Sequence, residues 1–383
     1  MIERARASAL PGIGRLAVDA VLGLTGVVES MHGTIARRPL PVGALADART
    51  RGVTRLVYQG IRSATRLMGG GLDLVLPLMP EPASTPRREA LVSALNGIVG
   101  DHLAATKNPL AIPMRFRRVR GPVTGRIVVL VHGLCMNPRQ WRRNGHDHGE
   151  ALALRLGFTP VYLRYNSGRH VSSNGRDFAA RLERLVAGWP VPVEEIALVG
   201  HSMGGLVARS ACHYAGVGGS RWLRHLSALV FLGTPHHGAP LERAGNLLEL
   251  VLGMSPYAAP LARIGGNRGA GIADLRFGNL LDEDWNGLPR RYRRDPRTPV
   301  PLPAGVRCFA VAASRSQTPC VASDLLGDGL VPVDSALGRH RDPRFALAFP
   351  AAHQHVSYGA GHFDLLDAPD VAERLEAWLS RSS

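Results

Sequence analysis

The chain has 383 residues, 45% of them hydrophobic, and a formal net charge of +16. This length and hydrophobic content allow a large buried core or two domains. Four cysteines, Cys135, Cys212, Cys308 and Cys320, are too few and too scattered for a disulfide scaffold. We expect them to be reduced, although Cys308 and Cys320 could pair if the loop between them folds back. Lys107 is the only lysine, so the excess of arginine over lysine indicates the base composition of the genome rather than selection for a ligand. The positive charge would still attract anionic lipids or polyanions.

The first 110 residues predict a helical N-terminal extension. They are rich in helix formers, and a Pro-rich linker lies near residues 77–86. Thr85-Pro86 is a cap and first-turn pair for a helix running toward Leu103. Asp19 interrupts an early apolar run without a small-residue cleavage site after it, so a secretory signal is not favoured. No stretch predicts a membrane-spanning helix, and we expect a cytoplasmic protein, with peripheral membrane association left open.

One helix of this extension, residues 51–67, has two faces. If it is helical at roughly 100° per residue, its basic side chains fall within an arc of about 60° and its apolar ones lie opposite. The arginines are Arg51, Arg55, Arg62 and Arg66, and the apolar side chains include Leu56, Val57, Ile61 and Leu67. This pattern is typical of a helix on an anionic membrane and of one packed on a core. We favour packing on the larger remainder of the protein, because Gly52 and Gly60 weaken an isolated helix.

The remainder, residues 111–383, alternates strand and helix patterns and predicts one large α/β domain. Residues 115–120 hold a dense arginine patch, but without interleaved aromatics or a nucleic-acid motif they do not predict nucleic-acid binding. Residues 126–131 are nearly continuous in aliphatic side chains and predict a buried strand. His132-Gly133-Leu134 follows, and the glycine lets the backbone turn inward so that the Leu134 N–H can face a developing alkoxide. We interpret His132 as a structural residue of this turn.

The most informative motif is Gly200-His201-Ser202-Met203-Gly204. A predicted strand at residues 161–165 and a predicted helix at residues 177–187 precede it. A short apolar run comes directly before the motif, and a helix-compatible segment follows it, which is the context of a serine nucleophile elbow. Small residues on both sides let strand and helix approach closely while Ser202 holds a strained backbone. The alternative is an ordinary glycine-rich turn with a solvated serine. In the catalytic interpretation, the Met203 N–H is the second oxyanion donor.

A strand at residues 226–233 leads into a long insertion at about 237–301. Its helical patterns, Leu241–Leu252 and Ile272–Leu281, are broken by Gly and Pro, and we expect a helical cap over the site rather than peripheral helices. His236 and His237 stand at its start, where packed or solvated histidines are favoured over metal ligands. No tight Cys/His cluster predicts a structural metal, and no cofactor is expected.

The acid and the base of a triad come late in the chain. A strand at 307–313 precedes Gly327-Asp328-Gly329, whose glycines permit a tight turn presenting Asp328, with Asp324 and Asp334 left as alternatives. The alternative role for each is a turn-forming aspartate. The base is expected at His362, on a glycine-rich loop before a helix at 371–379, rather than at His353 or His355.

These residues together resemble α/β-hydrolases of the lipase and GPI-inositol-deacylase-like group. The resemblance rests on the order Ser202, Asp328, His362, on His132-Gly133, and on the motifs at residues 233–238 and 327–332. It covers roughly residues 115–383. It implies a mostly parallel central sheet, a Ser-His-Asp triad and ester hydrolysis through an acyl-enzyme.

The sequence therefore predicts a serine carboxylic-ester hydrolase acting on an ester or lipid substrate, with a lipid-like acyl group as a hypothesis. Two alternatives stay open: an acyltransferase using the same triad, and a non-catalytic lipid-binding or scaffold protein. Neither the natural ester nor its chain length follows from the residues.

Overall fold

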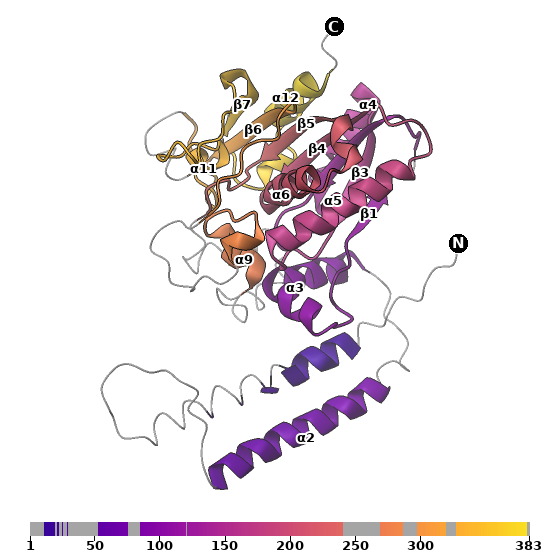
Figure 1. The fold of residues 1–383 in the computed structure, drawn as a ribbon, viewed down its shortest axis with the longest axis vertical. Coiled ribbons are helices and arrows are strands. Elements are labelled where there is room, and N and C mark those ends of the chain that lie inside the picture. Colours follow the sequence, from indigo (N-terminus) through magenta and orange to yellow (C-terminus); the bar gives the residue numbers. More distant parts are fainter. Residues whose placement is uncertain are drawn as a thin grey trace. The chain divides into compact units, whose positions relative to one another are not determined.

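A computed structural model describes residues 11–19, 21–22, 25, 29, 53–75, 85–119, 121–239, 269–285, 297–318 and 327–380 (Figure 1). The chain divides into two compact units. One consists of Met1–Ser84 and Leu103–Ala111, and the other of Thr85–His102 and Ile112–Ser383. Most of the predicted N-terminal helix after Thr85 thus belongs to the second unit.

The second unit is built on a seven-stranded sheet of order β1-β3-β2-β4-β5-β6-β7. Only β1 runs antiparallel, against β3, and all other neighbours are parallel. The strands are β1 Arg115–Arg118, β2 Arg126–Val131, β3 Thr159–Arg164, β4 Glu195–His201, β5 Leu226–Leu232, β6 Arg307–Ser314 and β7 Gln354–Tyr358. The predicted mostly parallel sheet is confirmed, and the arginine patch at its start forms the antiparallel edge strand.

Helices cover both faces of this sheet (Figure 1). The α-helices are α2 Val53–Val75, α3 Pro86–Ala105, α4 His148–Leu156, α5 Val171–Ala187, α6 Met203–Val217, α9 Ala270–Leu275, α11 Val333–Ala336 and α12 Pro369–Leu379. Short 3-10 helices are η2 Pro138–Trp141, η3 Arg221–His225, η6 Asp282–Asp284, η7 Ala351–His353 and η8 Asp364–Leu366. The predicted start of α3 is confirmed, since the Thr85 hydroxyl accepts the Arg88 N–H at 3.2 Å.

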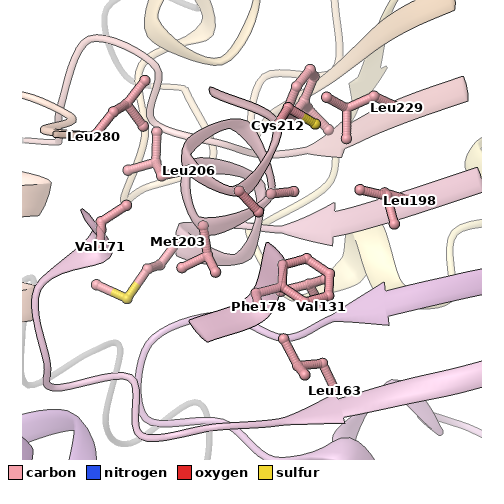
Figure 2. Close-up of a cluster of buried hydrophobic side chains, with 14 of the residues drawn as sticks. Val131, Leu163, Val171, Phe178, Leu198, Met203, Leu206, Cys212, Leu229 and Leu280 are labelled. Carbon is pink, nitrogen blue, oxygen red and sulfur yellow. The ribbon is translucent and has the colours of Figure 1, made fainter. Parts of the chain in front are cut away.

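Two hydrophobic cores lie on opposite faces of the sheet because successive strand residues point to opposite sides. In β2, Ile127 and Val129 join the core formed with α5 and α6, whereas Val128 and Leu130 join the core formed with α4 and α12. Figure 2 shows the first core, in which Phe178 of α5 lies beside strand side chains. The near-continuous aliphatic strands follow from burial on both faces.

Helix α6, which begins directly after Ser202, packs closely against α5. A Cβ atom at Gly175 would lie 2.2 Å from the Ser210 Oγ, so the two helices meet where α5 has no side chain. The structure begins α5 at Val171, two turns earlier than predicted. The polar and glycine residues of its first turns resemble a loop in sequence, but Ser172 and Asn174 are buried.

In the N-terminal unit, α2 turns a polar side inward. Tyr58 and Thr65 are buried, and Arg62 forms an ion pair with the buried Glu29 at 2.5 Å. Leu56 and Leu67 are 66% and 77% exposed, with Val57, Ile61 and Met68 also exposed. Packing of this apolar face on the larger remainder of the protein therefore stays a prediction. Among the described helices, none is both long and apolar enough to cross a bilayer.

The insertion is described only in part. The predicted helix at Leu241–Leu252 lies outside the described residues, as does Asp324. The predicted helix at Ile272–Leu281 is wrong in its extent, because α9 ends at Leu275 and Gly278 takes a φ of +76° that helical backbone does not adopt. The cap itself stays a prediction.

Candidate active site

The candidate residues follow the carboxyl ends of neighbouring parallel strands. Leu134 comes after β2, Ser202 after β4, Asp328 after β6 and His362 after β7. Because carboxyl ends of parallel strands share one edge, segments far apart in sequence meet there, which is where α/β sheets bind ligands. This edge is where the predicted site should form.

Ser202 stands on a sharp turn between β4 and α6. Its φ of 55° and ψ of −128° are strained for a residue with a side chain. The Ser202 N–H donates to Leu232 O at 2.8 Å, which fixes the turn against β5. The strain is thus held by the surrounding sheet.

Glycines make that turn possible by removing side chains at three contacts. A Cβ at Gly204 would lie 2.1 Å from Val131 O, and one at Gly200 would lie 2.6 Å from the Gly205 Cα. A Cβ at Gly205 would lie 2.0 Å from the Thr234 Oγ1. These distances bear out the prediction that small residues flank the serine so that strand and helix can approach.

The loop after β2 runs directly beside the serine. A Cβ at Gly133 would lie 3.0 Å from the Ser202 Cβ, so the glycine brings the Leu134 segment close to the serine. The next residue, Cys135, has a φ of 62°, and its N–H donates to the Ser167 hydroxyl at 2.9 Å. Met203 is the first residue of α6, and the first N–H groups of a helix have no partner within it.

Asp328 is held rigidly in a buried turn. Its Oδ1 accepts N–H groups from Leu330 at 2.8 Å and Val331 at 2.7 Å, and the side chain is 1% exposed. Gly327 and Gly329 take positive φ angles of 52° and 94°, as the tight turn requires. One carboxylate oxygen is therefore used for the turn, and the other is left for a second partner.

That partner is His362, whose Nδ1 lies 2.6 Å from Asp328 Oδ2. A carboxylate can only accept, so Nδ1 carries the proton and Nε2 is the basic nitrogen. The His362 ring packs over Gly233, where a Cβ would lie 3.2 Å from two ring atoms. Among the described residues, Nε2 is buried without a hydrogen-bond partner. The structure thus brings together the two late residues of the predicted triad.

Two hydrogen bonds to the backbone of the His362 loop are not predicted from the sequence. His201, directly before the serine, donates from Nε2 to His362 O at 3.1 Å. His148 of α4 contacts Leu365 O through Nε2 at 2.9 Å. The elbow motif itself contains His201, but a histidine within a motif does not reveal which carbonyl it meets.

An ion-pair cluster also anchors this loop. Arg143 pairs with Asp364 at 2.8 Å and with Asp367 at 3.2 Å, and Asn144 donates to Asp367 at 2.7 Å. Asp364 in turn accepts the Gly361 N–H at 2.8 Å. The segment that carries the imidazole is therefore tied on both sides of His362.

The alternative acid and bases lie elsewhere. Asp334 is exposed and pairs with Arg339 at 3.3 Å. His353 contacts Cys308 O at 3.1 Å, and His355 pairs with Asp370 at 2.8 Å. Each of these two histidines thus has a partner other than the Ser202 turn.

Burial keeps the neighbouring histidines neutral. It lowers the pKa of His132 to about 4 and that of His201 well below its usual range, the latter further lowered by His362. His132 stacks on Tyr165 with ring centroids 4.4 Å apart, and its Nδ1 meets Gly133 O at 2.9 Å. This environment suits the structural role predicted for His132.

Over the described ranges, no group of three or more His, Cys, Asp or Glu side chains could hold a metal ion. Cys135, Cys212 and Cys308 are free and buried. Burial raises the pKa of Cys135 and Cys308 to about 12, so these thiols are protonated packing groups.

A mostly parallel sheet with helices on both faces and a strained serine between β4 and α6 defines the α/β-hydrolase fold, and the predicted fold class is confirmed. Residues 122–262, less than half of the chain, match the family model described as PGAP1-like alpha/beta domain. This range includes the loop after β2 and the turn that carries Ser202. A sequence search of curated proteins finds no match.

Several solved structures are similar to the chain at low identity. The mature lipase BlEst2 of Bacillus licheniformis is 19% identical over 70% of this chain and 97% of its own, with a TM-score of 0.43. The esterase Pf2001 of Pyrococcus furiosus is 13% identical over 70% and 86%, with a TM-score of 0.41. Phospholipase PlaB of Legionella pneumophila, in complex with thio-NAD, is 19% identical over 55% and 44%, with a TM-score of 0.35. A shared fold does not define a shared substrate.

Proposed function

We propose that the protein is a serine hydrolase of carboxylic esters. The observation that carries this proposal is that the edge of the sheet formed by the carboxyl ends of its strands holds both a strained serine and a buried His362–Asp328 pair. In this mechanism the Ser202 Oγ attacks the ester carbonyl carbon while His362 Nε2 takes its proton. The proton then passes to the departing alkoxide, an alcohol leaves, and an acyl-enzyme remains. Water activated by the same Nε2 releases the acid and restores Ser202.

Asp328 has an orienting role in this mechanism. Its Oδ2 holds the His362 Nδ1 proton, which keeps Nε2 as the acceptor and stabilises the imidazolium that forms. Its Oδ1 accepts two backbone N–H groups, so the carboxylate cannot rotate without breaking both bonds. This rigidity supports catalysis because the base is oriented before the substrate arrives.

The oxyanion would be stabilised by the N–H groups of Leu134 and Met203. The contact between Gly133 and Ser202 supports the first, because it places the Leu134 loop beside the nucleophile. The position of Met203 at the start of α6 supports the second, because a helix N-terminus has free N–H groups and a partial positive charge. Two such preorganised donors are typical of acyl-transfer sites.

A lipid-like acyl group is the second part of the proposal. It is supported by the exposed apolar side of α2, where Leu67 and Met68 are 77% and 65% exposed. Arg66 lies beside them in sequence. A helix that presents apolar side chains next to cations can rest on an anionic lipid surface. Peripheral membrane association is proposed on the same ground, and the cytoplasmic location expected from the sequence stays a proposal.

The test is hydrolysis of p-nitrophenyl esters of increasing chain length by the wild type, Ser202→Ala and the control Ser220→Ala. Ser220 lies just after α6, the helix that follows Ser202, and its side chain makes no capping hydrogen bond. We expect the Ser202 variant to lose at least about 10⁴-fold in kcat, and the control to retain activity. Equal rates in all three proteins would contradict the proposal. Rates independent of chain length would contradict only its lipid-like part.

Two further readouts separate the alternatives. A fluorophosphonate probe should label the wild type on Ser202 and leave Ser202→Ala unlabelled. Added short alcohols should not divert the acyl group, since transfer in preference to hydrolysis would identify an acyltransferase. A wild type that neither turns over esters nor reacts with the probe would be a non-catalytic binding protein.

A further inference from the structure

A buried cation lies on α6, the helix that begins directly after Ser202. Arg209 of α6 is 4% exposed. Its Nη2 donates to Val300 O at 2.5 Å, and its Nη1 lies 3.3 Å from the His236 Nδ1. Its Nε is buried and has no hydrogen-bond partner within the described part of the chain. Arginine is almost never buried unless it is paired.

The electrostatic surroundings of Arg209 are positive. Burial and the neighbouring Arg297 lower the pKa of Arg209 to about 9. Arg297 is itself only 8% exposed and donates to His236 O at 2.8 Å. No ion pair between Arg209 and any carboxylate is found among the residues that the structure describes. Arg209 is thus buried beside a neutral histidine and a second guanidinium, and its own buried charge is costly without a counter-charge.

His236 adds a neutral donor to this cluster. Burial lowers its pKa well below the usual range, so the ring is uncharged. Because the Arg209 guanidinium can only donate, the His236 Nδ1 accepts and the proton sits on Nε2. That Nε2 is buried and finds no acceptor among the described residues. The cluster therefore contains two buried N–H donors that lack an acceptor.

A small cavity lies at this cluster. Arg209, His236, His237 and Arg297 line it together with Val300. About 10 Å³ is free inside it, which is room for one particle of about the size of a water molecule. The space is too small for a phosphate or a substrate acyl chain.

We propose that this cavity binds a single small monovalent anion, with chloride as its simplest occupant, beside the Arg209 guanidinium that lines it. The anion supplies the missing counter-charge for the guanidinium. A water molecule in the same place would leave the charge of Arg209 uncompensated. The lining is rich in donors and cations, which selects against a metal cation.

The position of this site suggests what the anion does. His236 lies where the insertion begins, and Arg297 and Val300 lie where it ends. Both ends meet Arg209 on the helix that carries Met203 at its start. A bound anion would therefore fasten both ends of the insertion to the nucleophile-bearing helix, independently of which reaction the serine performs.

The test is thermal unfolding of the full-length protein in sodium gluconate, with chloride or bromide replacing gluconate at constant ionic strength. Gluconate is too large for the cavity. We expect a saturable rise in Tm of about 3 °C at tenfold excess over the half-saturating chloride concentration. The rise should vanish in Arg209→Met and persist in Arg224→Met, which removes an exposed arginine of the same unit. A Tm independent of chloride, or an equal response in both variants, would overturn the proposal.

A second measurement needs no variant, so it tests the proposal even if Arg209→Met does not fold. Crystals of the wild type soaked in bromide should show an anomalous scattering peak in the cavity that Arg209, His236 and Arg297 line. A peak there supports the site without any substitution. A cavity that is empty of bromide, or filled by water alone, would overturn the proposal.

Discussion

In the sheet-bearing unit apolar side chains point inward, whereas in the N-terminal unit helix α2 points several of them outward. Val129 and Leu198 are completely buried between the sheet and its helices, while Leu67 of α2 is 77% exposed. The inward side of α2 instead carries the Arg62–Glu29 ion pair and Thr65. The two units thus use opposite patterns in one chain.

This contrast separates residues that fix a structure from residues that present a surface. In the sheet-bearing unit, the serine turn and the aspartate turn are tightly constrained by their neighbours, so small changes there have large costs. The exposed apolar side chains of α2 contribute little to the stability of their own unit. A patch of this kind normally marks an interaction site. The variants below test this difference from its strongest to its weakest consequence.

The largest effect is expected from Asp328→Asn. The asparagine Oδ1 can still accept the N–H groups of Leu330 and Val331, so the turn should fold. Its amide, however, would donate toward His362 Nδ1 and leave the wrong tautomer for proton transfer. We expect kcat for ester hydrolysis to fall about 10⁴-fold with little change in the unfolding midpoint. The matched control is Asp334→Asn, an exposed aspartate that pairs with Arg339, and its kcat should stay within about twofold. Similar losses in both variants would exclude Asp328 as the orienting acid.

Next in size is the effect of Gly204→Ala on stability. Its Cβ would lie 2.1 Å from Val131 O and 2.7 Å from His132 O, both backbone atoms that cannot move alone. We expect urea unfolding to show a loss of about 3 kcal/mol or more. Gly216→Ala, near the end of the same helix, has no atom within 4 Å of its new Cβ and should stabilise by up to about 1 kcal/mol. Equal stabilities for the two variants would show that the elbow is not sterically constrained.

Acid sensitivity should also be concentrated in the sheet-bearing unit. Burial lowers the pKa of His132 and of His148 to about 4 from 6.5, so protonation favours the unfolded chain. Their stabilisation is present above pH 6.5 and is lost as the pH falls toward 4. At pH 4 each could cost up to about 3 kcal/mol. Urea midpoints measured between pH 7 and 4 should therefore fall with a slope that steepens below 6.5. A constant midpoint down to pH 5 would contradict buried, neutral histidines.

Sequence patterns predict the centre of this fold better than its edges. Residues 126–131 and the Ser202 turn can be recognised because continuous aliphatic strands and glycine-rich turns depend on residues that are adjacent in sequence. The edge strand β1 is not, since its arginines read as a charged patch and only pairing with β3 makes it a strand. Helix α4 is absent from the elements expected from sequence; it has only nine residues, and its second residue is Gly149.

The candidate site shows the same division. Ser202, Asp328 and His362 sit in glycine-rich turns after strands, and those turns can be found without a structure. Arg209 cannot be found in this way, because an arginine within a helix is expected to face solvent. Its burial depends on Val300 and His236, which come from distant parts of the chain. The residues whose roles depend on long-range packing are those that sequence patterns miss.

The smallest effect on stability is expected on the exposed face of α2. Leu67→Glu removes an apolar side chain that is 77% exposed, so the free energy of unfolding should change by less than about 0.5 kcal/mol. If this face rests on anionic lipid, the same variant should bind anionic phospholipid vesicles about tenfold more weakly in sedimentation, because it loses apolar burial. Gln59→Glu is the matched control, since it adds the same charge at an exposed polar position of the same helix. A large loss of stability in Leu67→Glu would instead mean that this face packs on the rest of the chain, and equal weakening by both variants would reduce the interaction to charge alone.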